Sequence, residues 1–501
     1  MARTTLTGCL ALLGPDAKTS DGPVDIVIDG TRIADIRPAG ARPPDGAAID
    51  ASRHLVTAGL INGHVHSHEH FHKGRYDNLP LELWMNYVRP PRPIPFTPRQ
   101  VYLRTMIGAI EALRSGATTL CDDMNVAPIL DEAIVEAALQ AYDDIGIRAY
   151  LGITLFDKPF FRGMPYVEEE FPPALLRELS GSAATGPDEI LGFARKLART
   201  RHPRDRRVAY IAAPSAPQRC TKEFLLAVRR MADEFDLPVM MHVQETRLQV
   251  VTGLVMFGST MVEYLDRIGF LKPKTTLIHA IWLNPREIEI LGRTGATVQH
   301  NPTCNLKVGS GIAPVRALLD AGVNVSLGTD GCGSVETADM QKAVMAAALL
   351  QKIRGDDHTQ WIGAEEAWRA GTIGGARALG RERELGAVEV GRLADLAAYR
   401  LDRIPFAPLN DPLRQLVYSE TGAGLDMGFV DGEPVLMNGK LTRIDEAALI
   451  GEIQAEHEKL RPLIENAEQS VAPILAVYRH IYERCRKHPI AEDTYPARLP
   501  Y

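Results

Sequence analysis

The sequence predicts an α/β protein whose centre is a parallel, TIM-type (β/α)8 barrel, with a small β-sandwich built from both chain ends and a C-terminal helical tail. Three observations carry this prediction. Residues 55–385 alternate apolar, strand-like runs with helical segments. The two flanking segments hold short strands punctuated by turns, and the last segment repeats apolar residues at helical spacing.

The barrel is predicted from eight apolar runs, most of them separated from the next by a helical pattern. Predicted helices include Lys222–Phe235, Pro285–Arg293 and Ala313–Asp320, and Phe156–Pro173 is expected to be a long loop. The predicted strands are Leu55–His66, Ala117–Cys121, Ile147–Ile153, Val208–Ala213, Val239–Val243, Thr275–Ala280, Ala296–His300 and Val323–Thr329.

The ends of the chain complete the predicted organisation. Residues 1–54 and 386–446 hold short strands between turns, and neither segment is expected to stand alone, so we expect them to form one composite β-sandwich. Residues 447–501 form the predicted helical tail, which packs on the barrel or on another subunit. A homo-oligomer is the expected assembly.

Composition and charge indicate a folded protein that handles a small molecule. The chain has 501 residues, and 56 Lys and Arg against 63 Asp and Glu give a formal net charge of −7 without basic blocks. This balance disfavours a nucleic-acid partner and an anionic membrane surface. Hydrophobic residues make up 45% of the chain and charged residues 24%, which excludes a disordered or fibrous class. We therefore expect a small-molecule substrate.

The lack of a recognisable targeting signal and the pattern of cysteines favour the cytoplasm as the expected location. No run approaches the roughly 18 apolar residues of a membrane-spanning helix, and the run Gly8–Gly14 lacks the basic start and cleavage pattern of an export signal. The six cysteines are scattered without a CxxC pair, as is typical of a reducing compartment.

Side chains that bind metals follow several of the predicted strands. The first apolar run ends in Gly63-His64-Val65-His66, and residues two apart in a strand point to the same face. Alone, such a pair is as well explained by two surface histidines. Because the C-terminal strand ends of a barrel converge on one face, however, three further groups join this pair: His242, His279 and Asp330. Three imidazoles and a carboxylate predict a site for zinc or another first-row ion, with one position left for water.

A second motif, His68-Glu69-His70-Phe71-His72, fits the HExxH pattern of zinc peptidases. That chemistry needs a helix, but the segment follows a strand directly and meets Gly74 two residues later. We therefore favour a role for His68, His70 and His72 as pocket groups in the first β/α loop, with a solvated loop as the alternative.

With these residues in order, the sequence resembles the amidohydrolase superfamily, specifically its mononuclear branch of cytosine-deaminase-like, triazine-hydrolase and S-adenosylhomocysteine-deaminase-like enzymes. The resemblance covers nearly the whole chain. It is carried by Gly59–His66 (GLINGHVH), His242–Thr246 (HVQET), His279, His300–Lys307 (HNPTCNLK), Gly328–Gly331 (GTDG) and Gly391–Leu396 (GRLADL).

The resemblance implies a role for each matching residue. Glu245 would shuttle protons, His279 would orient or polarise the attacking water, and Asp330 can accept its proton. Dinuclear branches need a carboxylated lysine at the end of the fourth strand, and Tyr210–Pro214 contains none. One divalent ion is therefore expected, Zn²⁺ first, with Fe²⁺ or another first-row ion as alternatives. Its implied ligands are His64, His66, His242 and Asp330.

By the same resemblance, the chain is a hydrolase that cleaves a C–N bond other than a peptide bond with a metal-activated water. Glu245 and His279 favour an aminohydrolase, that is, a deaminase of a nitrogen heterocycle. The alternative is hydrolysis of an acyclic amide, urea or carbamate, as in phenylurea hydrolases. A third function, an inactive barrel kept as an assembly scaffold, is disfavoured because none of the expected ligands is lost.

The substrate pocket is less clearly marked in the sequence. Purine-nucleoside-type relatives carry a histidine in a Pro-His-Ser-Pro motif after strand four, whereas this chain has Pro214-Ser215-Ala216-Pro217. Because a pocket without that donor cannot favour a purine strongly, we expect poor turnover of adenosine, S-adenosylhomocysteine and guanine, and better turnover of a smaller or more apolar substrate. Candidate substrate contacts, each with packing as the alternative, are His68, His70, Trp84, Gln218 and Asn305.

Overall fold

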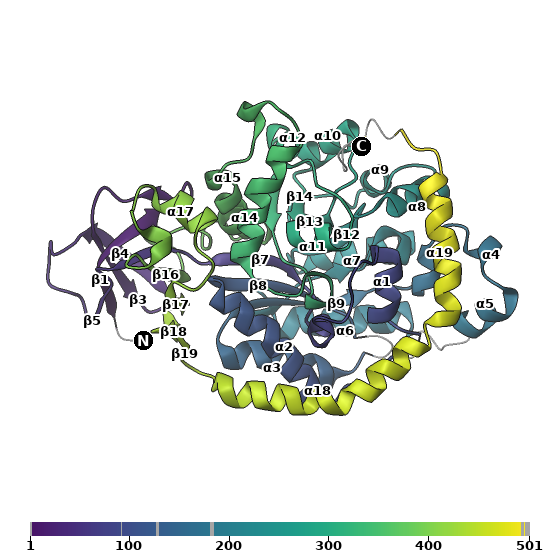
Figure 1. Cartoon of the computed structure of the whole chain (residues 1–501), viewed down its shortest axis with the longest axis horizontal. Helices are drawn as coiled ribbons and strands as arrows, with labels where there is room; N and C mark the ends of the chain where they lie inside the picture. Colours follow the sequence, from purple (N-terminus) through teal and green to yellow (C-terminus); the bar gives the residue numbers. More distant parts are fainter. Residues whose placement is uncertain (1–2, 92, 127–129, 181–184, 492–494, 496–501) are drawn as a thin grey trace.

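Parallel strands occupy the middle of the molecule, as the computed structural model of residues 3–91, 93–126, 130–180, 185–491 and 495 shows (Figure 1). They pair in chain order in two sheets, β7-β8-β9-β10 with β11 beside β9, and β12-β13-β14-β15. An isolated bridge between Ala212 and Val239 links the sheets at one seam. At the other seam the Asp330 N–H donates to the His64 carbonyl at 2.9 Å. The strands are β7 (Leu60–Val65), β8 (Ala117–Met124), β9 (Arg148–Leu155), β10 (Val208–Tyr210), β11 (Ala213–Pro214), β12 (Val239–Val243), β13 (Thr275–His279), β14 (Thr297–His300) and β15 (Asn324–Leu327).

All eight predicted strands are present in this part of the chain, and two of them are divided, since the predicted run Val208–Ala213 forms β10 and β11. The predicted run Leu55–His66 breaks at Gly59 into β6 (His54–Ala58) and β7. A Cβ at Gly59 would lie 2.1 Å from Thr118 Oγ1, so only glycine allows this close passage. The break sends β6 into a separate sheet, while β7 carries His64 at the centre of the molecule.

Helices surround the parallel strands, and β7, β8 and β9 are buried along their whole length, as expected when both faces of a parallel sheet are covered. Capping residues set several helix starts, such as the Thr97 capping box of α2 and the Asn284 capping box of α10. These helices are α2 (Pro98–Arg114), α3 (Glu132–Ile145), α6 (Pro187–Thr200), α7 (Lys222–Glu234), α8 (Arg247–Phe257), α9 (Met261–Arg267), α10 (Pro285–Thr294), α11 (Pro302–Lys307), α12 (Val315–Asp320), α13 (Cys332–Val335), α14 (Met340–Leu350), α15 (Ala364–Arg369), α16 (Gly375–Ala378) and α17 (Pro412–Tyr418).

Strands from both chain ends meet in a third sheet, which has ten strands. Its order is β19-β18-β17-β16-β6-β1-β3-β4, and β2 and β5 pair beside β1. The sheet has an apolar core of its own that includes Leu6, Ile26 and Phe429. Its strands are β1 (Thr4–Leu13), β2 (Lys18–Thr19), β3 (Val24–Asp29), β4 (Arg32–Pro38), β5 (Ala47–Asp50), β6, β16 (Leu396–Arg400), β17 (Leu425–Val430), β18 (Glu433–Met437) and β19 (Lys440–Leu441).

Two predicted loops contain helical turns. The histidine-rich segment after β7 is a 3-10 helix, η1 (Ser67–His72), followed by α1 (Leu81–Val88). The predicted loop Phe156–Pro173 holds η2 (Phe160–Gly163) and α4 (Val167–Glu170) and leads into α5 (Pro173–Ser180). The prediction of an irregular loop was wrong here, because Phe161, Val167 and Phe171 bury their side chains in a small apolar core.

The predicted tail contains two helices, α18 (Glu446–Gln469) and α19 (Ala472–Lys487); residues 492–494 and 496–501 of the prediction lie outside the described residues. In Figure 1, α18 runs along one side of the molecule and α19 turns up beside α1 and α8. Across the described residues, no single helix has the length and apolar character to span a membrane, although the bent pair α8 and α9 meets those criteria together.

Candidate active site

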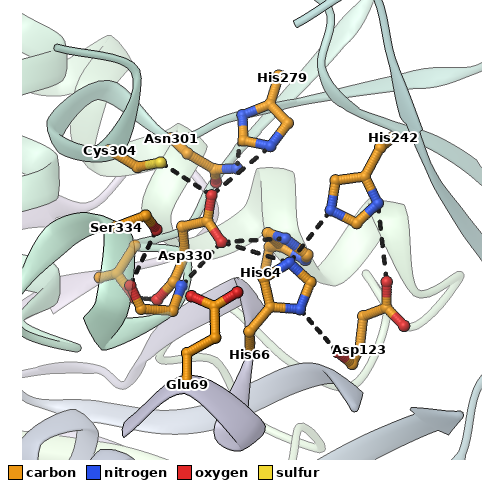
Figure 2. A network of polar contacts seen from close by, with 12 residues as sticks. His64, His66, Glu69, Asp123, His242, His279, Asn301, Cys304, Asp330 and Ser334 are labelled. Atoms are coloured by element: carbon orange, nitrogen blue, oxygen red, sulfur yellow. Dashed lines mark hydrogen bonds and ion pairs between the residues drawn. The ribbon is translucent and has the colours of Figure 1, made fainter. Parts of the chain in front are cut away.

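Three imidazoles and one carboxylate predicted as metal ligands converge at the carboxyl ends of the parallel strands (Figure 2). His64 lies in β7 and His66 directly follows it, so both side chains point to the same face. His242 lies in β12, and Asp330 follows β15. The structure therefore brings together groups that are up to 266 residues apart in the sequence.

The distances within this cluster suit a single shared ion. His66 Nε2 and His242 Nε2 are 3.2 Å apart, and Asp330 Oδ1 lies 3.5 Å from both His64 Nε2 and His66 Nε2. Ligand atoms of His64, His66 and His242 all lie within 4.8 Å of one another, as do those of His64, His279 and Asp330.

His64 supplies the test of whether a metal fits. Its side chain is fully buried, and neither Nδ1 nor Nε2 has a hydrogen-bond partner among the described residues. Buried polar atoms are rarely left without a partner, because their desolvation then goes uncompensated. Three imidazoles with a carboxylate are also the donor set that zinc and similar ions prefer. The residues present therefore fit a divalent metal.

The protonation states of these groups favour metal binding. Burial, followed by the nearby His64, lowers the pKa of both His66 and His242 well below the usual value for histidine. Burial alone would raise the pKa of Asp330, but the surrounding imidazoles, His64 first, hold it well below its usual range. Neutral imidazoles and an ionised carboxylate are the forms that coordinate a cation.

A second set of groups fixes the orientation of the cluster. His66 Nδ1 lies 2.7 Å from the Asp123 carbonyl, and His242 Nδ1 lies 3.1 Å from the Ser215 carbonyl. Each hydrogen bond engages Nδ1 and leaves Nε2 facing the cluster, the arrangement that typically orients histidine ligands.

Asp330 is held by both of its carboxylate oxygens. Oδ1 accepts a hydrogen bond from the Gly331 N–H at 2.8 Å, and Oδ2 accepts from Cys304 Sγ at 2.9 Å. Burial raises the pKa of the Cys304 thiol well above its usual value, so this group keeps its proton and can donate it. Asp330 adopts a left-handed φ of 82°, which is costly for a non-glycine residue and turns the chain at the end of β15.

Glu245 and His279 stand side by side next to the predicted ligands. His279 Nε2 lies 3.5 Å from Glu245 Oε2 and 3.6 Å from Asp330 Oδ2, while its Nδ1 lies 2.9 Å from Asn305 Oδ1. Burial lowers the pKa of His279 to about 4 and raises that of Glu245 well above its usual value, with Asp330 adding to the rise. Burial therefore favours the neutral imidazole of His279 and the protonated carboxyl group of Glu245.

A cavity opens over this cluster and separates the predicted substrate contacts into two groups. Trp84 and Gln218 line it, together with Glu245 and Ser215, and Gln218 Oε1 has no hydrogen-bond partner among the described residues. The other three predicted contacts, His68, His70 and Asn305, are buried behind the wall. Asn305 supports His279 there. His68 Nδ1 accepts from the Asn125 N–H at 3.2 Å, and His70 Nδ1 lies 2.8 Å from the Arg104 carbonyl.

His70 is directed away from the cavity, which does not support its prediction as a substrate contact. A Cβ on Gly108 of α2 would lie 2.0 Å from the His70 ring, so the imidazole of this η1 residue packs tightly against α2. The HExxH reading of this segment also lacks support, because η1 is a short 3-10 helix rather than an α-helix.

Several groups at the site were not predicted from the sequence. Asp123 is the second of two acidic residues that end β8, and a polar pair after an apolar run was an available signal. Cys304 lies in the segment His300–Lys307, which carries part of the family resemblance, but no role was predicted for it. Glu69 lines the cavity with 1% of its side chain exposed, and Arg219 lines it from η3 (Pro217–Arg219). Both lie in short 3-10 helices; Glu69 belongs to the HExxH match but was given no role, and no sequence pattern marked Arg219.

A parallel α/β core whose strand ends carry three convergent imidazoles and an aspartate defines a metal-dependent hydrolase of the TIM-barrel type. The chain belongs to the amidohydrolase family, whose model matches residues 55–435.

Comparisons with individual proteins agree with this family. The chain is 33% identical over 410 residues to a 5-methylthioadenosine/S-adenosylhomocysteine deaminase of Pyrococcus furiosus, covering 82% of this chain and 90% of the relative. It is 31% identical over 439 residues to a 5'-deoxyadenosine deaminase of Methanothermobacter thermautotrophicus, covering 87% and 95%.

Solved structures show the same fold. An adenosine deaminase from Xanthomonas campestris with bound zinc has a TM-score of 0.81 at 28% identity, over 92% of this chain and 99% of that chain. Atrazine chlorohydrolase from Arthrobacter aurescens, complexed with zinc, has a TM-score of 0.81 at 23% identity, over 91% and 100%. At that identity the second likeness concerns the fold alone.

Proposed function

We propose that this protein is a metal-dependent aminohydrolase that deaminates a nitrogen heterocycle. The observation that carries the proposal is the buried cluster of His64, His66, His242 and Asp330 with Glu245 beside it on the cavity wall. The relatives named above as deaminases support the reaction type. Zn²⁺ is the ion we propose first, since the similar adenosine deaminase structure contains it.

The four predicted ligands would hold the ion, and when bound it would lower the pKa of a water molecule toward about 7 and so supply the nucleophile. Asp330 would accept a proton from the attacking water through Oδ2, the oxygen that faces His279. The neutral His279 would orient that water through Nε2, because its Nδ1 is engaged by Asn305.

Glu245 would deliver a proton to the leaving nitrogen. Its carboxyl group lies on the cavity wall, accepts a hydrogen bond from Ser310 Oγ at 3.3 Å and lies 3.5 Å from His279 Nε2. Because burial raises the pKa of Glu245 well above its usual value, the protonated form of this carboxyl group is favoured. That protonated state is what a general acid needs.

The substrate class within the deaminases is proposed from Ser215. Its side chain lines the cavity at the position where purine-reading relatives are expected to carry histidine. We infer that the cavity takes a smaller or more apolar heterocycle in preference to a purine nucleoside. The names of the relatives favour the opposite order, so the preference has to be measured.

The test is ammonia release from a panel of heterocyclic amines that includes adenosine, 5'-methylthioadenosine, cytosine and melamine, with Glu245→Gln as the matched control. The same panel includes phenylureas and anilides, followed by product analysis. Ammonia release from a ring amine that the control variant loses supports the proposal. Turnover of the ureas or anilides alone would instead establish the acyclic amide or urea hydrolase.

The finer architecture is also proposed here. We infer that the eight parallel strands of residues 55–385 close into one barrel, which the contacts at both seams support. The sheet of residues 1–54 and 386–446 would fold over its own core as a sandwich, and residues 447–501 would form the tail. A cytoplasmic location, supported by six free, buried cysteines, and a homo-oligomer stay predictions.

A further inference from the structure

The C-terminal helix α19 lies against the outside of the cavity wall. Three short elements that contribute to the wall are α1, η2 and α8, through residues such as Leu81, Phe160 and Leu248. Their remaining apolar side chains pack with α19 in one buried cluster, and Figure 1 shows α19 beside α1 and α8. From α19 this cluster includes Ile474, Leu475, Tyr478, Ile481 and Cys485, and from the wall elements it includes Leu83, Phe161, Leu248 and Val251.

Tyr478 of this cluster contacts the wall residue Phe160. Its side chain is 2% exposed, and its ring centroid lies 5.8 Å from that of Phe160, with 26° between the ring planes. Phe171 packs edge-on against the same ring at 5.7 Å and 87°. Both separations fall in the range of favourable aromatic pairs, so Tyr478 holds Phe160 from behind.

Phe160 in turn supports a charged group of the cavity. The Arg219 guanidinium lies 5.3 Å from the Phe160 ring centroid and 4.5 Å from that of Phe156. Its Nε donates to the Lys158 carbonyl at 3.3 Å, and its side chain lines the cavity with 7% exposed. Cation–π contacts on two rings fix the direction of this side chain.

Polar contacts secure α19 at both of its ends. At the end of α18, just before α19 begins, Glu468 accepts two hydrogen bonds from Arg75, at 2.9 Å each, and one from Tyr76 at 2.6 Å. Just after the helix, the His488 carbonyl accepts from Arg247 Nη2 at 2.8 Å. Arg75 and Tyr76 lie between η1 and α1, and Arg247 begins α8. The tail is therefore tied to the elements that it covers.

We propose that α19 is the outer support of the substrate cavity, and that Tyr478 is a positioning residue that keeps Phe160, and through it Arg219, in the cavity wall. The inference rests on the proposed function only in regarding this cavity as the substrate site. Loss of the Tyr478 ring would loosen the wall, whereas the strands that carry the metal ligands would keep their packing.

The test uses a cysteine inside the cavity and needs no substrate. Cys304 lines the cavity and is 1% exposed, while Cys121 is buried in the core between the parallel strands. The metal-loaded protein is treated with iodoacetamide, and the alkylation rate of each cysteine is followed by mass spectrometry of its peptide. Tyr478→Ala should speed alkylation of Cys304 at least about tenfold and leave Cys121 unchanged, because a local opening exposes only the cavity.

Matched variants separate positioning from a general loss of stability. Tyr478→Phe keeps the ring and should react like the native protein, and Arg479→Ala changes an exposed neighbour on the same helix. Phe160→Ala should reproduce the effect of Tyr478→Ala, and the double variant should add little to either, since both act on one contact. Tyr478→Leu serves in the same experiment if the alanine variant does not fold.

Two results would overturn the proposal. One is an unchanged Cys304 rate in Tyr478→Ala or Tyr478→Leu, and the other is a parallel rise at Cys121, which would mean that Tyr478 stabilises the whole fold. Because the readout is alkylation rather than turnover, it stands whether or not the deaminase assignment does.

Discussion

Three of the four predicted ligands are held by neighbouring groups that decide which of their atoms face the centre. Main-chain carbonyls at Asp123 and Ser215 engage the Nδ1 atoms of His66 and His242. Only His64 lacks such a partner among the described residues. A metal ion coordinated by His64 would therefore give this ring the partner that it lacks, and its positive charge would balance the Asp330 carboxylate.

The purified protein should hold about one equivalent of Zn²⁺ or a similar ion, because His64, His66, His242 and Asp330 converge and the fourth strand supplies no bridging lysine. His64→Ala and Asp330→Ala should each lose the ion and the activity, as measured by elemental analysis after dialysis. His358→Ala changes an exposed histidine and should keep both. Two tightly held ions per chain would contradict the assignment.

Glu245→Gln should retain the metal and lose at least about two orders of magnitude in turnover, since proton transfer of this kind contributes roughly 10²–10⁴. The amide keeps the size of the side chain and its contact with Ser310 but cannot carry a proton. Metal content and kcat are measured on the same sample. Loss of the metal from this variant would show that Glu245 is a ligand.

The native chain should turn over adenosine poorly, and Ser215→His should raise its kcat/KM. The side chain at 215 lines the cavity, and a donor matched to a ring nitrogen discriminates strongly against molecules that lack that nitrogen. Steady-state kinetics of both proteins on adenosine and on melamine test this. A native kcat/KM above about 10⁴ M⁻¹s⁻¹ on adenosine, ordinary for a true substrate, would refute the substrate inference.

Local sequence patterns predicted the elements that repeat and missed those fixed by distant contacts. The eight strands were visible because each is a buried apolar run, and His64, His242 and Asp330 could be grouped because parallel strand ends meet. By contrast, η2 depends on packing against α19, more than 300 residues further along the chain. The burial of Glu69 and the direction of the His70 side chain, away from the cavity, depend on the same kind of distant contact. The local sequence therefore did not predict them.

The burial of the His70 imidazole against α2 should make the free energy of unfolding depend on pH. Burial lowers the pKa of His70 to about 4, against about 6.5 in the unfolded chain. Between these values the unfolded state binds the extra proton, so the free energy of unfolding falls as the pH drops from about 6.5 to about 4.

In His70→Gln this fall should be smaller by up to about 1.4 kcal/mol per pH unit, the contribution of one proton. Urea unfolding of both proteins at several pH values measures the difference, and contributions common to the two, such as loss of metal in acid, cancel. His358→Gln at an exposed site should leave the slope unchanged. An identical slope in the native protein and His70→Gln would argue against a buried, neutral His70.

Across the whole molecule, the sheet of the chain ends and the parallel strands are coupled through a continuous stretch of chain and a buried ion pair. β6 belongs to the sheet, and β7, which carries His64, follows it after the single residue Gly59. Arg148, at the start of β9, donates to Asp395 Oδ2 through Nε at 2.8 Å and to Oδ1 through Nη2 at 3.1 Å. It also contacts Asp431 at the end of β17.

Arg148→Ala should therefore destabilise both parts together, by about 3–5 kcal/mol, because it leaves two carboxylates buried or half-buried without their cation. The side chains of Arg148 and Asp395 are only 3% and 4% exposed, so solvent screens this pair little. Arg204→Ala is the matched control: it breaks a pair with Asp236 in which the side chains are 71% and 50% exposed, and such pairs contribute at most about 1 kcal/mol. Guanidinium unfolding is followed by far-ultraviolet circular dichroism and by tryptophan fluorescence, and the two probes should give one coincident transition in the native protein. The fluorescence reports on residues 55–385, which contain Trp84, Trp282, Trp361 and Trp368.

Equal losses of stability in the two variants would show that the ion pair does not couple the sheet to the parallel strands.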